Sequence, residues 1–461
     1  MICVDGWGDT SDFNAYGYRT KHSGHWQHTY AWWATELAKR GMILGIYDNP
    51  LWINRAAANA GYKIKGTNIP IADLIDYSET SAFGFTWVQV DRPGAEEYVK
   101  GCIQHYADMG VRYLRVDFLS WYETGTDYYM GVVGRTDRPR ADYETALRWM
   151  REECDKQGMF LSLVMPHLKN DAELELKYGH MVRINEDTAE GGWYRFSDNA
   201  RGIRKDNWSQ LKNPFDGFIY WSKISGRNKM ILDGDFIRLN TYANDEERKA
   251  VISLHLMAGG PVSVADQYNT IGSSLWIYQN TELLALNEDG FAGQPLSNGL
   301  ADNSRNQVWK GQMSNGDWVV GLFNRESTSQ TRIVNFSSDL GISSGYVRDL
   351  WEHADLGSKS LLAVSIPSHS CKIYRISSSP NSVPTLHPDE ISLYPIGNNQ
   401  FVAQNSGNAS IKVFDLQGKI IYTSKLLSGK EIINFQMLPK GIYMIHIQKG
   451  EAYKTFKCFI Q

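Results

Sequence analysis

The stretches YLRVDF at residues 113–118 and VRINED at residues 182–187 decide the fold. Each starts with an apolar run typical of a buried strand and ends close to a carboxylate. In a barrel of parallel strands, the residues that follow the strands meet at the carboxyl-terminal mouth, where the loops build the binding site. We therefore predict that Asp117 and Asp187 converge at one rim.

Short strand-like runs alternate with helical patterns as far as about residue 265. The predicted strands are Ile2–Asp5, Ile43–Tyr47, Tyr113–Asp117, Phe160–Val164, Met181–Asn185, Met230–Leu232 and Val262–Val264. The predicted helices include Trp26–Arg40, Ala95–Met109, Tyr143–Gln157 and Asp245–Met257. Such alternation predicts a parallel sheet closed into a (β/α)8 TIM barrel. An eighth strand is either Phe85–Val90, which could equally be a hairpin excursion, or a strand upstream of Met1.

The pattern changes after the barrel, which we assign to residues 1–290. Alternating strands without helices predict an antiparallel β-sandwich at 291–376. A Ser/Pro-rich linker follows at 377–390, and a small all-β module occupies 391–461. Three domains suit a chain of 461 residues, which is too long for one ordinary core.

Composition excludes several classes of partner. A net charge of −4 gives no electrostatic reason to expect nucleic acid or an anionic membrane surface. The sequence contains no run of about 18 apolar residues, so no transmembrane helix is predicted. The five cysteines are scattered, and His22, His25, His28 and His167 fit no metal-binding spacing, so neither a disulfide framework nor a metal site is predicted. Nucleotide-binding glycine loops are also missing from the sequence.

Two carboxylates at one rim can act as nucleophile and acid/base on a glycosidic bond. The alternative is that either aspartate caps a helix, or pairs with Arg115 or Arg183. Arg115 and Asp117 are two residues apart on a strand and share a face. Arg115 should therefore lower the pKa of Asp117 and keep it ionised, unless the two form a plain buried ion pair.

Three further strand ends could present polar groups and an aromatic ring to a sugar. Asp5-Gly6-Trp7 follows the first strand, Tyr47 ends the second, and Asp233-Gly234-Asp235 follows a later one. Asp-Gly is also a common turn pair. We favour that turn interpretation for Asp233 and leave both open for the other strand ends.

Several motifs, in the same order, resemble the α-galactosidase-like glycoside hydrolases of family 27 over about residues 1–376. They are ICVDGW, KRGMILGIY, GVRYLRVDF, VRINED, ILDGDF, NEDGFAGQP, VWKGQMSNGDWVVGLFNR and VRDLWEHADLG. The resemblance implies a retaining exo-α-glycosidase, first of all an α-galactosidase, that needs no cofactor. Asp117 matches the nucleophile and Asp187 the acid/base. The sugar-contacting positions are matched by Asp5, Tyr47, Arg115, Arg183 and Asp235.

Two departures from the family pattern concern specificity. Val4-Asp5 stands where family galactosidases have two adjacent acids, and Val164 stands where a glutamate often binds the 2-hydroxyl. A β-L-arabinopyranoside, an N-acetylgalactosaminide or an isomaltose-type substrate therefore remains open, as does a non-catalytic carbohydrate-binding surface protein. Asp5 matches the end of the family's second barrel strand, so we expect the first strand upstream of Met1.

The tail carries IKVFDLQGKIIYTSKLL and LPKGIYMIHIQKGEAYKTFKCFI. It resembles the C-terminal sorting domains of type IX secretion in Bacteroidetes. The resemblance implies a partner in the secretion machinery and export to the cell surface or medium. The start of the chain has no signal-peptide pattern, which fits the expected upstream segment. The alternative is an ordinary accessory β-module.

Overall fold

The chain forms two units, Met1–Ser378 and Ser379–Gln461. The computed structural model describes residues 1–6, 13–80, 84–204, 208–380, 391–397, 399–405, 409–415, 418–426, 429–449 and 452–460. Each unit has its own buried apolar cluster, so each is described by itself.

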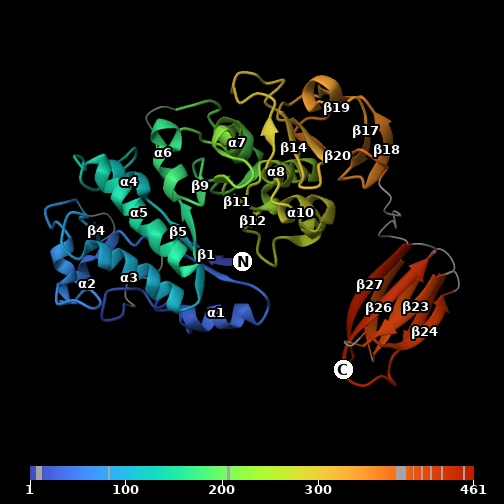
Figure 1. Cartoon of the computed structure of the whole chain (residues 1–461), viewed down its shortest axis with the longest axis horizontal. Coiled ribbons are helices and arrows are strands. Elements are labelled where there is room, and N and C mark those ends of the chain that lie inside the picture. Colours follow the sequence, from blue (N-terminus) through green and yellow to red (C-terminus); the bar gives the residue numbers. More distant parts are fainter. Residues whose placement is uncertain are drawn as a thin grey trace. The chain divides into compact units, whose positions relative to one another are not determined.

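A parallel sheet organises the first unit (Figure 1). Its strands are β1 (Ile2–Val4), β2 (Leu44–Tyr47), β5 (Val111–Val116), β8 (Phe160–Leu163), β9 (Met181–Arg183) and β10 (Ile231–Asp233). Within the described residues these six pair in chain order, each parallel to the next. Beyond β10, β11 (Phe236–Ile237) pairs in parallel with β12 (Ser263–Val264). The predicted class, a TIM barrel followed by a β-sandwich, is confirmed.

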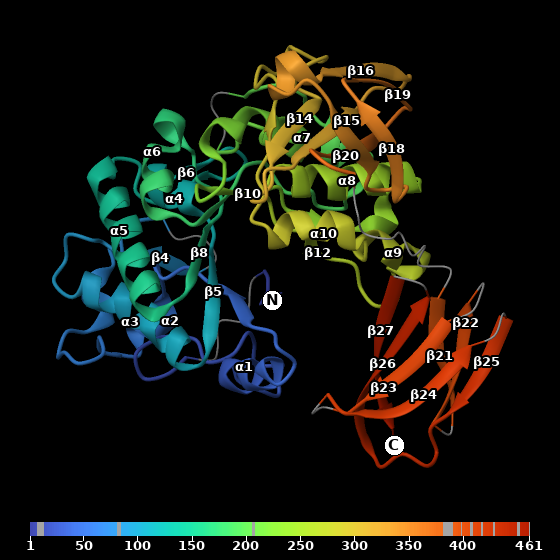
Figure 2. The ribbon, with the colours of Figure 1, turned by 45° about the vertical axis from the view of Figure 1, so that its right-hand side comes forward.

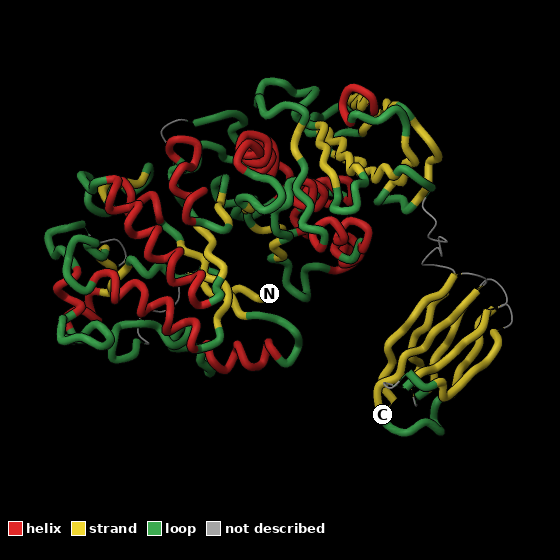
Figure 3. Tube along the Cα trace, in the orientation of Figure 1, coloured by secondary structure: helices red, strands yellow, loops and turns green. Residues whose placement is uncertain are grey.

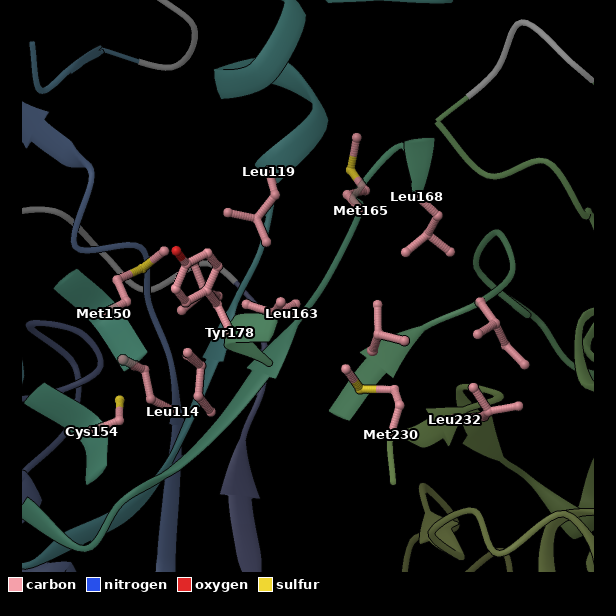
Figure 4. Close-up of a cluster of buried hydrophobic side chains, with 14 of the residues drawn as sticks. Leu114, Leu119, Met150, Cys154, Leu163, Met165, Leu168, Tyr178, Met230 and Leu232 are labelled. Atoms are coloured by element: carbon pink, nitrogen blue, oxygen red, sulfur yellow. The ribbon is translucent and has the colours of Figure 1, made fainter. Parts of the chain in front are cut away.

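Helices lie between and after these strands in the chain. They are α1 (Tyr30–Ala38), α2 (Arg55–Asn59), α3 (Ala95–Asp108), α4 (Leu119–Thr124), α5 (Arg140–Gln157), α6 (Lys169–Tyr178), α7 (Pro214–Trp221), α8 (Asp245–Met257), α9 (Leu275–Tyr278) and α10 (Thr281–Glu288). Figure 4 shows Leu114 and Leu163 of the strands facing Met150 and Cys154 of α5. Because side chains alternate along a strand, this outward apolar row leaves the neighbouring positions, such as Arg115, to face the barrel interior.

The stretch at 85–90 does not supply a barrel strand. β4 (Phe85–Trp87) pairs antiparallel with β3 (Trp52–Asn54), so the hairpin alternative is the correct one. A second short hairpin, β6 (Thr126–Asp127) with β7 (Gly131–Val132), follows α4. The expectation of a strand upstream of Met1 stays a prediction.

The sandwich packs on the barrel as part of the same unit. Its strands are β13 (Gln294–Pro295), β14 (Val308–Gln312), β15 (Trp318–Asn324), β16 (Gln330–Asn335), β17 (Gly345–Asp349), β18 (Ala354–Lys359), β19 (Leu361–Ile366) and β20 (Ser370–Ser377). One sheet has the order β13-β14-β15-β20-β17-β18, and β16 pairs with β19. A buried ion pair joins Arg325 to Asp216 of α7, and Trp351 Nε1 donates to Ser253 Oγ of α8 at 2.9 Å. The predicted boundary at residue 290 stays a prediction.

The second unit is built from strands (Figure 3). They are β21 (Ile391–Gly397), β22 (Gln400–Asn405), β23 (Ala409–Phe414), β24 (Ile420–Leu426), β25 (Gly429–Asn434), β26 (Gly441–Lys449) and β27 (Ala452–Ile460). Two antiparallel sheets, β21-β22-β25 and β24-β23-β26-β27, enclose one apolar core. In the part of the chain that is described, no helix of either unit is both long and apolar enough to cross a bilayer.

Candidate active site

The predicted site residues that the structure describes lie at or shortly after the carboxyl-terminal ends of the barrel strands β1, β2, β5, β9 and β10. In the strand register Tyr47 lies beside Arg115, and Arg183 lies beside Asp233. Asp117 follows β5 directly, as Asp5 follows β1. Trp7, the predicted aromatic sugar contact, lies outside the described residues.

Asp117 is half-buried and held through both carboxylate oxygens. Its Oδ1 accepts from the backbone N–H of Phe118 at 2.6 Å, and its Oδ2 accepts from the Tyr47 hydroxyl at 2.8 Å. Asn49 Nδ2 donates to the backbone carbonyl of Asp117 at 2.6 Å. The carboxylate therefore has a fixed position, as a nucleophile requires.

Burial raises the pKa of Asp117 to about 6, although Arg115, the Phe118 amide and the Tyr47 hydroxyl all act to lower it. Arg115 lowers the pKa of Asp117 as predicted, but the loss of hydration outweighs the guanidinium. The negative charge of Asp187 makes a smaller contribution to the rise in the pKa of Asp117.

Asp187 differs from Asp117 in its surroundings, with 82% of its side chain exposed. Its Oδ1 accepts from Arg183 Nη2 at 2.9 Å, so the predicted pairing with Arg183 and a rim position occur together. The same guanidinium nitrogen lies 2.9 Å from Asp235 Oδ2. Arg183 thereby connects an exposed carboxylate to a buried one.

Asp235 also holds the loop that carries Asp187. Its Oδ2 accepts from the backbone N–H of Thr188 at 2.7 Å and from the Thr188 hydroxyl at 3.0 Å. Asp235 and Arg183 are each only 2% exposed at the side chain. The contacts of Asp235 suit a residue that positions Asp187, since its Oδ2 is already occupied by the protein.

A second buried pair lies deeper in the barrel. Arg115 Nη1 donates to Asp233 Oδ2 at 2.7 Å, while Arg115 Nε is 3.7 Å from Asp5 Oδ2. The Arg115 guanidinium also lies over the Phe236 ring, 5.5 Å from its centroid. Burial raises the pKa of Asp5 despite Arg115, whereas Arg115 and Arg183 together overcome burial and hold the pKa of Asp233 below its usual value.

The turn interpretation of Asp233 is confirmed for one carboxylate oxygen, but the other oxygen has a partner that the sequence did not predict. Its Oδ1 does accept from the Asp235 backbone N–H at 2.8 Å, as in a turn, but its Oδ2 forms the buried pair with Arg115. The signal was present in the sequence: Met230–Asp233 is another apolar run that ends on a carboxylate.

Backbone strain marks the same rim. Phe118, Met165 and Asp235 have φ values of 62°, 56° and 76°, although none is glycine. Such conformations cost about 1–3 kcal/mol each and persist only where the surroundings impose them. Phe118 is held by its ring, which stacks on Trp52 with centroids 5.2 Å apart. This conformation directs the chain away from the barrel immediately after Asp117.

The charges of the site favour a positively charged reaction centre. Five carboxyl groups share the barrel mouth and interior with two guanidinium groups: Asp5, Asp117, Asp187, Asp233 and Asp235 with Arg115 and Arg183. Fixed negative groups stabilise charge that develops in a transition state, and glycoside cleavage develops positive charge on the sugar. Among the described residues no group of three or more His, Cys, Asp or Glu side chains is arranged to hold a metal ion.

Comparisons with known proteins agree with this architecture. The family described as the alpha galactosidase C-terminal beta sandwich domain matches residues 303–376, and the secretion system C-terminal sorting domain matches residues 392–461. The isomalto-dextranase of Arthrobacter globiformis is 43% identical over 392 residues. That match covers 82% of this chain but only 61% of the relative.

Solved structures extend the likeness. The Arthrobacter globiformis T6 isomalto-dextranase complexed with panose superposes with a TM-score of 0.78 at 33% identity, over 99% of this chain and 88% of that one. A GH27 β-L-arabinopyranosidase from Geobacillus stearothermophilus shares the fold, with a TM-score of 0.64 at 19% identity, over 80% of this chain and 83% of that one. The chain therefore belongs to the α-galactosidase-like glycoside hydrolases of family 27, and its C-terminal type IX sorting domain marks it for export.

Proposed function

We propose that this protein is an exported, retaining exo-α-glycosidase that releases isomaltose from α-1,6-linked glucans. Two observations together support the proposal. The reaction centre pairs a fixed, half-buried Asp117 with an exposed Asp187, and the chain is 43% identical to an isomalto-dextranase over most of its length. Among the substrates left open by the sequence, the isomaltose-type one fits both.

In the first step, an Asp117 oxygen attacks the anomeric carbon while the glycosidic C–O bond breaks. Asp187 gives its proton to the departing oxygen, and a glycosyl ester forms on Asp117. In the second step a water molecule attacks the same carbon, Asp187 takes a proton from that water, and the ester bond breaks. Two inversions retain the anomeric configuration.

The surroundings of Asp117 suit this role. With a pKa of about 6, the carboxyl is mostly ionised at neutral pH yet more basic than an ordinary aspartate. The Tyr47 hydroxyl and the Phe118 amide hold its two oxygens, so little reorganisation precedes attack. Arg183 and Asp235 would then act on Asp187, keeping its carboxyl at the rim above the nucleophile.

An α-galactosidase is the second candidate. It is favoured by the match of residues 303–376 to the α-galactosidase sandwich domain and by 24% identity over 289 residues to a rice α-galactosidase. Against it stand two departures from the pattern of family galactosidases, the single acid at Val4-Asp5 and Val164.

The test is product analysis with the full-length protein. Dextran, nitrophenyl α-galactoside and nitrophenyl β-L-arabinopyranoside are incubated separately, and released sugars are identified by chromatography. Isomaltose from dextran, formed first as its α-anomer by NMR, supports the proposal. Release of galactose without isomaltose would replace it with the second candidate. Dextran binding without hydrolysis of any substrate would instead indicate a non-catalytic binding protein.

For export, we propose that the second unit engages the type IX secretion machinery and is the part of the chain that this machinery recognises. The support is the match of residues 392–461 to the sorting-domain family, together with the separate core of this unit.

A further inference from the structure

A hairpin beside the reaction centre displays apolar side chains to solvent. After α4, residues 126–132 form the β6–β7 hairpin, in which Tyr128 and Tyr129 are 71% and 74% exposed. Met130 and Val132 are also exposed. Contiguous exposed apolar groups on a soluble domain commonly mark a binding surface.

Asp127 forms hydrogen bonds within the hairpin and to α4. Asp127 Oδ1 accepts from the backbone N–H groups of Tyr129 and Met130, at 2.8 and 2.9 Å. Its Oδ2 accepts from Trp121 Nε1 of α4 at 3.0 Å. The two tyrosine rings stand perpendicular, with centroids 4.9 Å apart. These contacts hold the backbone of the hairpin in one conformation, which favours binding because less conformational freedom is lost when a ligand arrives.

The hairpin is continuous with the reaction centre through side-chain contacts. Phe118, the residue after Asp117, packs on Trp121 with ring centroids 4.3 Å apart, and Trp121 bonds to Asp127. Thr124 lies just before the hairpin, and its Oγ1 is 3.2 Å from Nε2 of His167 in the loop after β8. Figure 2 shows β6 beside α4, beyond the ends of β5 and β8. The displayed rings thus belong to the loops of the carboxyl-terminal mouth.

The side chains at the tip of the hairpin indicate which class of ligand would bind there. Residues 128–133, YYMGVV, carry no charge, which offers nothing to a charged polypeptide or nucleic acid and suits a neutral polyhydroxylated chain. Aromatic rings with polar tips provide an apolar face for a sugar ring and a hydroxyl for its edge. An exo-acting enzyme holds only the chain end at its carboxylates, so the rest of a polymer must leave past the rim.

We propose that Tyr128, Tyr129 and Met130 form a platform that binds the glucan chain outside the reaction centre. This inference rests on the proposed function for the identity of the chain. It makes the hairpin a determinant of polymer affinity and gives it no part in bond cleavage.

The experiment compares the full-length protein with a Tyr128→Ala/Tyr129→Ala double variant. Asp127 bonds to main-chain groups and to Trp121, so the hairpin persists in this variant. We expect KM for dextran to rise about 3- to 10-fold, as the loss of one or two stacking contacts implies. Activity on nitrophenyl isomaltoside should stay unchanged, and Tyr128→Phe/Tyr129→Phe should keep near-normal KM for dextran.

A matched control removes exposed apolar groups elsewhere: Ile333→Ala/Leu361→Ala on the β16–β19 pair should leave KM for dextran unchanged. Retardation of each variant in a native gel that contains dextran measures binding of the polymer independently of catalysis. If dextran is never hydrolysed, the proposed function fails while this gel still tests the platform. Unchanged KM and retardation in the double variant would overturn the platform, and so would a change in its oligomeric mass, which would make the hairpin a self-association surface.

Discussion

The Tyr47 hydroxyl donates a 2.8 Å hydrogen bond to Asp117 Oδ2 and is the one side-chain group seen to hold this oxygen among the described contacts. The bond stabilises the ionised carboxylate against a pKa that burial raises to about 6. Tyr47→Phe should therefore raise the pKa of Asp117 further. We expect the acid limb of the kcat/KM profile to move upward by about 0.5–1 pH unit. An unmoved limb would show that another group governs it.

The elevated pKa of Asp117 also predicts how stability depends on pH. A folded-state pKa above the unfolded value means that the folded protein holds the proton more tightly, so stability falls as pH rises from about 4 to about 6. Asp117→Asn removes this loss and keeps an acceptor for the Phe118 amide. The variant should be inactive yet about 1–3 kcal/mol more stable than the wild type at pH 7, with little difference at pH 4. Denaturant unfolding at both pH values measures this, and equal stabilisation at both would contradict the cause.

Asp187→Ala tests the acid/base role. Because a nitrophenolate leaves without protonation, this variant should lose far more activity on dextran, by several orders of magnitude, than in the first step on a nitrophenyl glycoside. Added azide should restore turnover by replacing the water that Asp187 activates, giving an α-glycosyl azide. Equal losses on both substrates, with no azide rescue, would remove Asp187 from this role.

A variant at Thr188 distinguishes two possible roles of Asp235, positioning Asp187 or contacting the sugar. The Thr188→Val variant removes one of the donors to Asp235 while the backbone N–H remains. If Asp235 positions Asp187, this variant should lower kcat about 3- to 10-fold with little change in KM. A rise in KM with normal kcat would favour the sugar-contacting role predicted from the family resemblance.

A protein ending at Ser378 tests the independence of the two units. Because each unit has its own core, the truncated enzyme should keep its kcat, its KM for short substrates and the unfolding midpoint of the first unit. In the native host it should no longer reach the cell surface or medium. Loss of activity in the purified truncated protein would show that the second unit supports the first.

The strand-end rule predicted Asp117 and Asp187, and both follow strands of the parallel sheet: Asp117 comes directly after β5, and Asp187 lies in the loop after β9. The same rule also marked Asp233 as a strand end, but there the Asp-Gly pair favoured a turn. Local chemistry could not show that this aspartate had a buried partner 118 positions away in the sequence, Arg115. For the same reason the sequence predicted the lowering effect of Arg115 on the pKa of Asp117 but not the larger, opposite effect of burial. Burial depends on what surrounds a residue in space.

The amino-acid sequence by itself determined the order of the modules, the parallel strands and which carboxylates end them, because side-chain periodicity and motif order are properties of the linear chain. The tertiary structure decided which charges meet. In the structure Arg115 pairs with Asp233, and Arg183 pairs with both Asp187 and Asp235. The Tyr47 hydroxyl donates a hydrogen bond to Asp117. Those choices follow from strand register and burial, which bring distant residues together and set the strength of each charge.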